Sequence, residues 1–246
     1  MARARRPLVD HHGAMTTSPT LPMEPTDRTR VNRGRNRAVA DRAALLALLD
    51  DAYIAHLGVT VGEHPVVLPT AYAVDPDGPD HGGTLYVHGS VAAGWLRKSG
   101  GATVCVTVTE LDGLVAGRSS FHHSMNYRSA VVIGEARLVD DPDERLRALD
   151  LIVDHMIPGR AATLRPSTRK ELAATAVLAV PLHEASMKAR AGGPVDEPDD
   201  VAAGTWGGHL PVTRVVGAPV PADDNLPGVG VPDDVAAGSV RGRSRG

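Results

Sequence analysis

The chain has 246 residues, of which 42% are hydrophobic and only 3% aromatic, so aliphatic side chains have to build its core. A net charge of −3 offers no basic field to attract nucleic acid, and a single cysteine, Cys105, excludes an internal disulfide and a cysteine-based zinc site. Because no apolar run is long enough to span a membrane and the basic N-terminus lacks the apolar segment of a secretory signal, we expect a cytoplasmic protein without nucleic-acid or membrane partners.

The beginning of the chain is poor in structural signals. Residues 1–30 show no apolar periodicity and are expected to form a disordered leader. A basic segment overlaps its end and continues beyond it. We favour a solvated lead-in for this segment; the alternative is an arm that folds over a phosphate or a partner subunit. Its arginines are Arg28, Arg30, Arg33, Arg35 and Arg37.

Regular elements begin after this segment. Asp41 is an N-cap residue type, and apolar residues at helical spacing predict a helix over residues 42–51. A hairpin follows, with strands over 53–61 and 64–74. Within it, Pro69 marks an edge, a bulge or a departure from the ladder. Further strands are expected over 84–88, 103–111 and 114–118.

The longest strand-like run ends at Val139 and is entered through a dense polar cluster, residues 121–129. Asp141 and Pro142 then start an amphipathic helix. Many short strands with few helices between them, and no β-α-β alternation, predict a mainly β fold: a β-barrel with peripheral helices. The remaining expected elements are a helix over 167–174, strands over 176–182 and 210–216, and a disordered tail over 217–246.

The common nucleotide and hydrolase motifs are absent from the sequence. It contains no G-x-G-x-x-G, no P-loop, no H-E-x-x-H and no G-x-S-x-G. A nucleotide cofactor, if bound, therefore has to be held by another route.

One polar group stands where the strand over 84–88 gives way to a short helical segment ending near Lys98. Gly89 permits close approach of the backbone, and Ser90 offers a hydroxyl beside a helix N-terminus, which suits a phosphate. An ordinary serine N-cap explains the same residues, and we favour it on this evidence alone.

The second polar group is the cluster over 121–129. Its Arg128 is suited to a phosphate or a developing negative charge, and the polar side chains before it are suited to a heteroaromatic ring. A polar loop at a strand end is the simpler alternative. A metal site built with His88 is disfavoured, because the adjacent His122 and His123 point apart in an extended chain.

The order of these motifs resembles that of the pyridoxamine 5′-phosphate oxidase-like FMN-binding split barrels, and most closely their flavin-nucleotide-binding branch, which includes the nitroimidazole-resistance proteins. The resemblance spans residues 31–216, which we take as one domain. It rests on Val31-Asn32-Arg33, Ala40-Asp41-Arg42, Ala55-His56-Leu57-Gly58-Val59, Val67-Leu68-Pro69-Thr70-Ala71-Tyr72, Leu85-Tyr86-Val87-His88-Gly89-Ser90, Cys105-Val106-Thr107-Val108 and His122-His123-Ser124-Met125-Asn126-Tyr127-Arg128-Ser129-Ala130-Val131.

The resemblance implies a homodimeric FMN-binding split β-barrel with the cofactor at the subunit interface. Relatives often carry a basic residue in the turn after the His-Gly-Ser element; that turn lacks one here, and Arg97 or Lys98 is the substitute. The cofactor-binding residues that the resemblance and the polar groups together suggest are Pro69, Thr70, His88, Gly89, Ser90, Lys98, His123, Ser124, Asn126, Tyr127 and Arg128.

The expected function is an FMN-dependent oxidoreductase that acts on a small organic substrate and takes electrons from a separate donor. The flavin would carry the redox chemistry, so no single residue is expected to be catalytic. The alternatives are a non-catalytic flavin carrier or redox sensor, or the same barrel with deazaflavin F420 or haem in place of FMN.

Overall fold

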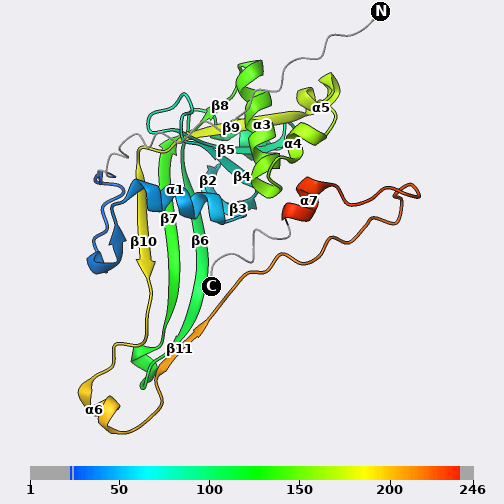
Figure 1. The fold of residues 1–246 in the computed structure, drawn as a ribbon. Coiled ribbons are helices and arrows are strands. Elements are labelled where there is room, and N and C mark those ends of the chain that lie inside the picture. The colour runs from blue at the N-terminus through cyan, green and yellow to red at the C-terminus, as the bar shows by residue number, and fades with distance from the viewer. Residues whose placement is uncertain (1–22, 24, 239–246) are drawn as a thin grey trace, which may run out of the picture.

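The structure, a computed structural model, describes residue 23 and residues 25–238. Within these residues two antiparallel sheets are accompanied by peripheral helices (Figure 1), which confirms the expected mainly β fold. The strands are β1 (Ala38–Val39), β2 (Ala55–Val61), β3 (His64–Thr70), β4 (Tyr72–Asp75), β5 (Thr84–Ser90), β6 (Thr103–Ala116), β7 (Ser124–Glu135), β8 (Arg137–Leu138), β9 (Thr175–Pro181), β10 (Ala185–Arg190) and β11 (Gly208–Pro211). The helices are α1 (Arg42–Asp51), α2 (Gly94–Ser99), α3 (Pro142–Met156), α4 (Arg160–Thr163), α5 (Arg169–Ala174), α6 (Pro198–Ala202) and α7 (Asp233–Gly238), with 3-10 turns η1 (Arg35–Arg37) and η2 (Ser120–His122).

The two sheets are joined by strands that continue from one into the other. The larger sheet has the order β1-β10-β7-β6-β2-β3, with β11 paired to the far end of β6, and the smaller has the order β4-β5-β9-β8. The chain passes between them at Ala71, from β3 to β4, and at Ala136, from β7 to β8. These two corners bend the sheets around a common interior, the arrangement of a split barrel.

Aliphatic side chains fill that interior, as the composition requires. Leu45, Leu48 and Leu49 of α1 are fully buried against the inner faces of the strands. A second apolar cluster lies between the smaller sheet and α3. Gly134 is needed on the inner face of β7, because an added Cβ would lie 3.1 Å from Val180 Cγ1.

Several element limits differ from the sequence predictions. Helix α1 has the predicted limits, but the strands expected over 103–111 and 114–118 are one strand, β6, whose register shifts between Leu111 and Gly113. The strand expected over 64–74 is interrupted at Ala71 rather than at Pro69. Pro69 lies on β3, the edge of the larger sheet, which is one of the three positions predicted for it.

Strands β6 and β7 extend well beyond the barrel (Figure 1). We call this extension the arm; it comprises residues 110–128 of the β6–β7 hairpin and residues 190–211, which include α6 and β11. From β11 the chain returns to α7, which is held to α4 by an ion pair of 3.2 Å between Arg160 and Asp234. The arm therefore carries side chains far from the barrel interior.

The predicted domain limits, 31–216 with a leader and a tail, remain a prediction. Residues 1–22 of the leader and 239–246 of the tail lie outside the described residues. Just before residue 31, the Arg28 guanidinium donates to the Glu184 carboxylate. No described helix combines the length and apolarity needed to cross a bilayer.

Candidate functional site

Arg128, predicted to face the cofactor, lies on β7 among three acidic side chains of neighbouring elements. Its Nε and Nη2 donate to both oxygens of Asp112, at 3.0 and 2.9 Å, and Nη2 also donates to Asp51 at the end of α1, at 3.0 Å. The hydrogen bonds with Asp112 and Asp51 outweigh burial and raise the pKa of Arg128. Arg214 donates to Glu110 and Asp51 beside them. A contact between Arg128 and a cofactor would therefore be additional to these ion pairs.

Pro69 and Thr70, two further predicted cofactor-binding residues, end β3. Tyr72, the first residue of β4, pairs with Val87, the neighbour of His88. Only Ala71 separates Thr70 from that pair, so the structure brings Thr70 and His88 to the same corner of the barrel.

His88 is the predicted site residue with the most unusual surroundings. Its ring borders a cavity of about 240 Å³ between β5, α3 and α5. The lining is apolar on α3 and at Leu172, and polar at Ser167, Glu171 and Thr175. Its Nδ1 is buried and has no hydrogen-bond partner among the described residues, and burial lowers the pKa of the ring. An unpaired buried nitrogen is costly in a native protein unless a ligand or water satisfies it.

Ser90 is not the helix N-cap that we favoured. Ala93 occupies that position in α2, and Ser90 Oγ instead accepts from the Ala92 amide at 3.2 Å. The Ser90 side chain is exposed, and its hydroxyl can still donate to a ligand. Lys98 is exposed on α2, while the side chain of Arg97 lies outside the described part of the structure. An added Cβ at Gly89 would lie 2.9 Å from Leu96 Cδ1, so the end of that side chain would have to shift.

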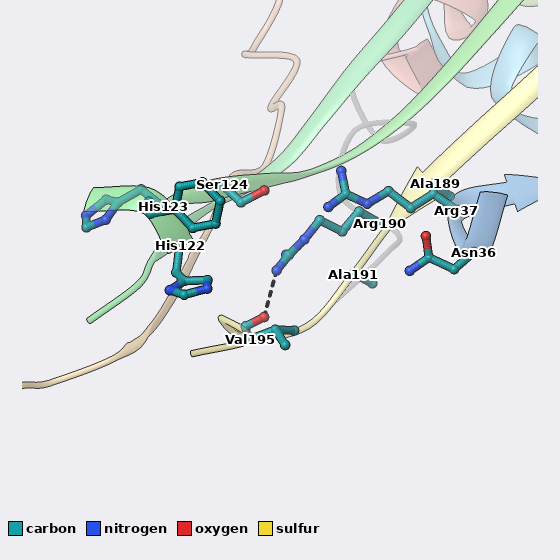
Figure 2. A pocket seen from close by; sticks show the side chains of 11 residues that line it. Asn36, Arg37, His122, His123, Ser124, Ala189, Arg190, Ala191 and Val195 are labelled. Carbon is teal, nitrogen blue, oxygen red and sulfur yellow. Dashed lines mark hydrogen bonds between the residues drawn. The ribbon is translucent and has the colours of Figure 1, made fainter. Parts of the chain in front are cut away.

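The remaining predicted residues lie along the arm. His123 and Ser124 line a pocket of about 480 Å³ (Figure 2). Asn126 is buried and donates from Nδ2 to the Gly192 carbonyl at 3.1 Å, which gives it a structural role. Tyr127 is half-buried, opposite Leu111 of β6.

The arm pocket also contains residues that the sequence did not identify as a site. Figure 2 shows Arg37 and Arg190 extending from η1 and β10 toward Ser124 and His122. The pairing of Ala38 with Lys188 positions Arg37 beside the end of β10. The basic segment that contains Arg37 was the sequence feature that could have identified it as a site residue. Nothing in the local sequence distinguishes Arg190 from other surface arginines.

The predicted residues therefore form two separate groups within one chain. One is the barrel corner with Thr70, His88 and Ser90; the other is the arm with His123, Ser124 and Asn126. Ser124 lies six residues before Ala130 on β7, roughly 20 Å at about 3.3 Å per residue. Ala130 is in the same lateral row as Thr70, by way of Val108 and Ala55.

Comparison with known proteins agrees with this architecture. The sequence profile of pyridoxamine 5′-phosphate oxidase matches residues 41–189, which include both groups. The chain belongs to the pyridoxamine 5′-phosphate oxidase family. No curated protein matches this chain.

Two solved structures are similar over nearly their whole length. The flavocytochrome Anf3 from Azotobacter vinelandii is 36% identical, with a TM-score of 0.80, over 88% of this chain and 98% of its own. An FAD- and haem-binding protein from Mycobacterium smegmatis is 39% identical, with a TM-score of 0.76, over 82% of this chain and 97% of its own. A candidate 5-nitroimidazole antibiotic resistance protein from Bacteroides thetaiotaomicron, 23% identical over 61% of this chain and 85% of its own, has a TM-score of 0.50 and shares the fold.

Proposed function

We propose that this protein is a flavin-dependent oxidoreductase that acts on a small organic substrate and takes electrons from a separate donor. The observation that carries the proposal is its similarity, over nearly the whole chain, to a flavocytochrome and to an FAD- and haem-binding protein. When bound, a flavin supplies the electron-accepting ring, and the protein contributes binding, orientation and exclusion of water.

The barrel corner is the proposed site for the part of the cofactor that FMN and FAD share. Pro69 and Thr70 would lie against the ring. Ser90 and Lys98 would hold the phosphate, as a hydroxyl donor at the end of β5 and a cation on α2. The unpaired His88 Nδ1 supports a ligand near this corner, because a buried nitrogen without a partner is costly.

A second copy of the chain would complete the site. Val67 and Pro69 are exposed on the outer face of the larger sheet, and Thr107 and Val131 of the same face are half-buried. These small and apolar side chains suit a close interface between two identical sheets. We therefore propose a homodimer with the flavin between its subunits.

The absorption spectrum of the purified protein tests the proposal. We expect a flavin spectrum that bleaches on reduction, and a released ligand with the mass of FMN or FAD. The reduced protein should transfer electrons to an acceptor over repeated turnovers. A protein that stays colourless and binds neither nucleotide on reconstitution would disprove flavin binding. Flavin binding without turnover would identify a carrier or sensor instead.

Haem is a second candidate cofactor, bound together with the flavin. The two similar proteins named above are described as a flavocytochrome and as an FAD- and haem-binding protein. In this chain His88 is the candidate ligand of the iron. Burial lowers the pKa of the His88 ring and so favours the neutral form, which is the form that binds haem iron, and part of the adjoining cavity lining is apolar. His88 would hold the haem iron, which would supply one-electron chemistry beside the flavin.

Replacing His88 separates this second candidate from the first. His88→Ala should lose the haem absorption band and keep the flavin spectrum, and added imidazole should restore the band. His64→Ala, which removes an exposed imidazole at the start of β3, is the matched control and should change neither. An unaltered haem band in His88→Ala would assign the ligand elsewhere.

A further inference from the structure

The arm pocket has a basic side. Arg37 and Arg190 line it, and within the described part of the chain neither is paired with a carboxylate. Arg190 is held in place by backbone carbonyls, since its Nη1 and Nη2 donate to Gly192 and Gly193 at 3.2 and 2.8 Å. Two guanidinium groups without a paired carboxylate, of which that of Arg190 is held in place, form a site for an anion.

The pocket lining also has apolar and aromatic members. Phe121, the single phenylalanine of the chain, is 90% exposed at the pocket edge, and Val195 is 79% exposed. Asn36 adds an exposed amide, a group that recognises the edge of adenine. An aromatic surface, an amide and two guanidinium groups are the combination that a nucleotide requires.

Acidic residues lie near the pocket but do not line it. His122 lies 3.9 Å from Asp196 and from Asp200, and 4.0 Å from Glu197, and none of these carboxylates lines the pocket. The Asp196 side chain is fully buried and accepts from the backbone amide and Nη1 of Arg118, at 2.9 and 2.7 Å.

The contact between Arg118 and Asp196 also fixes the shape of the arm tip. Arg118 also donates from Nε to the Thr205 carbonyl at 3.0 Å, so residues 191–207 are attached to the β6–β7 hairpin on both sides. A pocket whose walls are already in position loses little freedom when a ligand binds. The arm tip is therefore preorganised for ligand binding.

From these observations we propose that the arm pocket binds the adenosine diphosphate half of FAD. The phosphates contact Arg37 and Arg190, and the adenine packs on Phe121. This inference rests on the proposed flavin function and adds that the bound flavin nucleotide is FAD and not FMN. The arm pocket and the row of Thr70 are separated by about 20 Å along β7. A ligand that contacts both has to be long, and FAD is the longer of the two flavin nucleotides.

The test compares FAD and FMN on the same variants. Wild-type protein, Arg37→Gln and Phe121→Ala are titrated with each flavin while flavin fluorescence is followed, and the flavin retained on purification is identified. We expect each substitution to weaken FAD binding about tenfold and to leave FMN binding unchanged. ADP should displace FAD from the wild-type protein.

Arg33→Gln is the matched control, because Arg33 is an exposed arginine of the same segment that does not line the pocket. It should change neither affinity. Equal losses for FAD and FMN, or no loss in either pocket variant, would overturn the inference. So would dissociation of the protein by Phe121→Ala in a sedimentation experiment, since the pocket would then be a subunit contact. A wild-type protein that binds neither flavin would instead disprove the proposed function itself.

Discussion

Arg128 illustrates at the scale of one residue what a local sequence pattern leaves out. Its position in a polar cluster at a strand entrance suggested a charge free to meet a cofactor. The structure surrounds it with Asp112 from β6 and Asp51 from α1. These partners come from other elements, so no local spacing predicts them. The charge of Arg128 holds α1 to the hairpin.

Removing that charge should destabilise the protein. Arg128→Ala leaves Asp51 and Asp112 close together without their cation, and the three side chains are 29–36% exposed, so solvent screens part of the loss. We expect a decrease of roughly 1–2 kcal/mol in the free energy of unfolding, measured by urea denaturation.

Arg33→Ala, which removes an exposed arginine, is the control and should unfold at the wild-type urea concentration. If Arg128→Ala is as stable as the wild type but loses its flavin, Arg128 acts on the cofactor and not on the fold.

At the scale of elements, the sequence predicted the limits of a helix or strand correctly where local interactions determine them. Helix α1 has its predicted limits because Asp41 caps it, accepting from the Ala43 amide at 2.9 Å, and the apolar spacing is local too. Strand β6 was predicted as two strands because Asp112 and Gly113 have the residue types of a turn. Pairing with β7 on both sides of that point overrides the local preference. The arm, which depends on this continuity, was therefore missed.

The tip of the arm depends on Gly117. An added Cβ there would lie 2.5 Å from the carbonyl carbon of His122 and 2.7 Å from its oxygen, which are backbone atoms. Gly117→Ala should therefore lower stability by about 1–3 kcal/mol and speed hydrogen exchange at the hairpin tip. Gly94→Ala is the control, because nothing lies within 4 Å of an added Cβ there. Equal melting temperatures for the two variants would show that the tip rearranges freely.

At the scale of the whole molecule, the edge strand β3 limits how a second copy can associate. Pro65 and Pro69 lack amide donors, so this edge is a poor template for adding another strand. The outer face beside it is available, with Val67 63% exposed. Association through the face of the sheet is therefore favoured over association through its edge. The sequence suggested a dimer only through its resemblance to a family.

A charge on this face should separate the subunits. Val67→Asp would bury a carboxylate in the interface, which is costly without a partner, and we expect the mass in solution to fall toward that of one chain, 25.7 kDa. Light scattering measures this mass. Leu146→Asp makes a similar change at a partly exposed position on α3 and should leave the mass unaltered. An unaltered mass in Val67→Asp would place the interface elsewhere.

The pairing of β1 with β10 has a consequence for the order in which the protein is made. Ala38 lies opposite Lys188, a residue roughly 150 positions later, whereas β6 and β7 are joined by one short turn. During synthesis the hairpin can form as soon as both strands have emerged, but β1 has no neighbour until β10 appears. Arg37 and Arg190, at opposite ends of this delay, come to line one pocket only when β10 pairs with β1. The arm pocket is thus among the last features of the chain to be assembled.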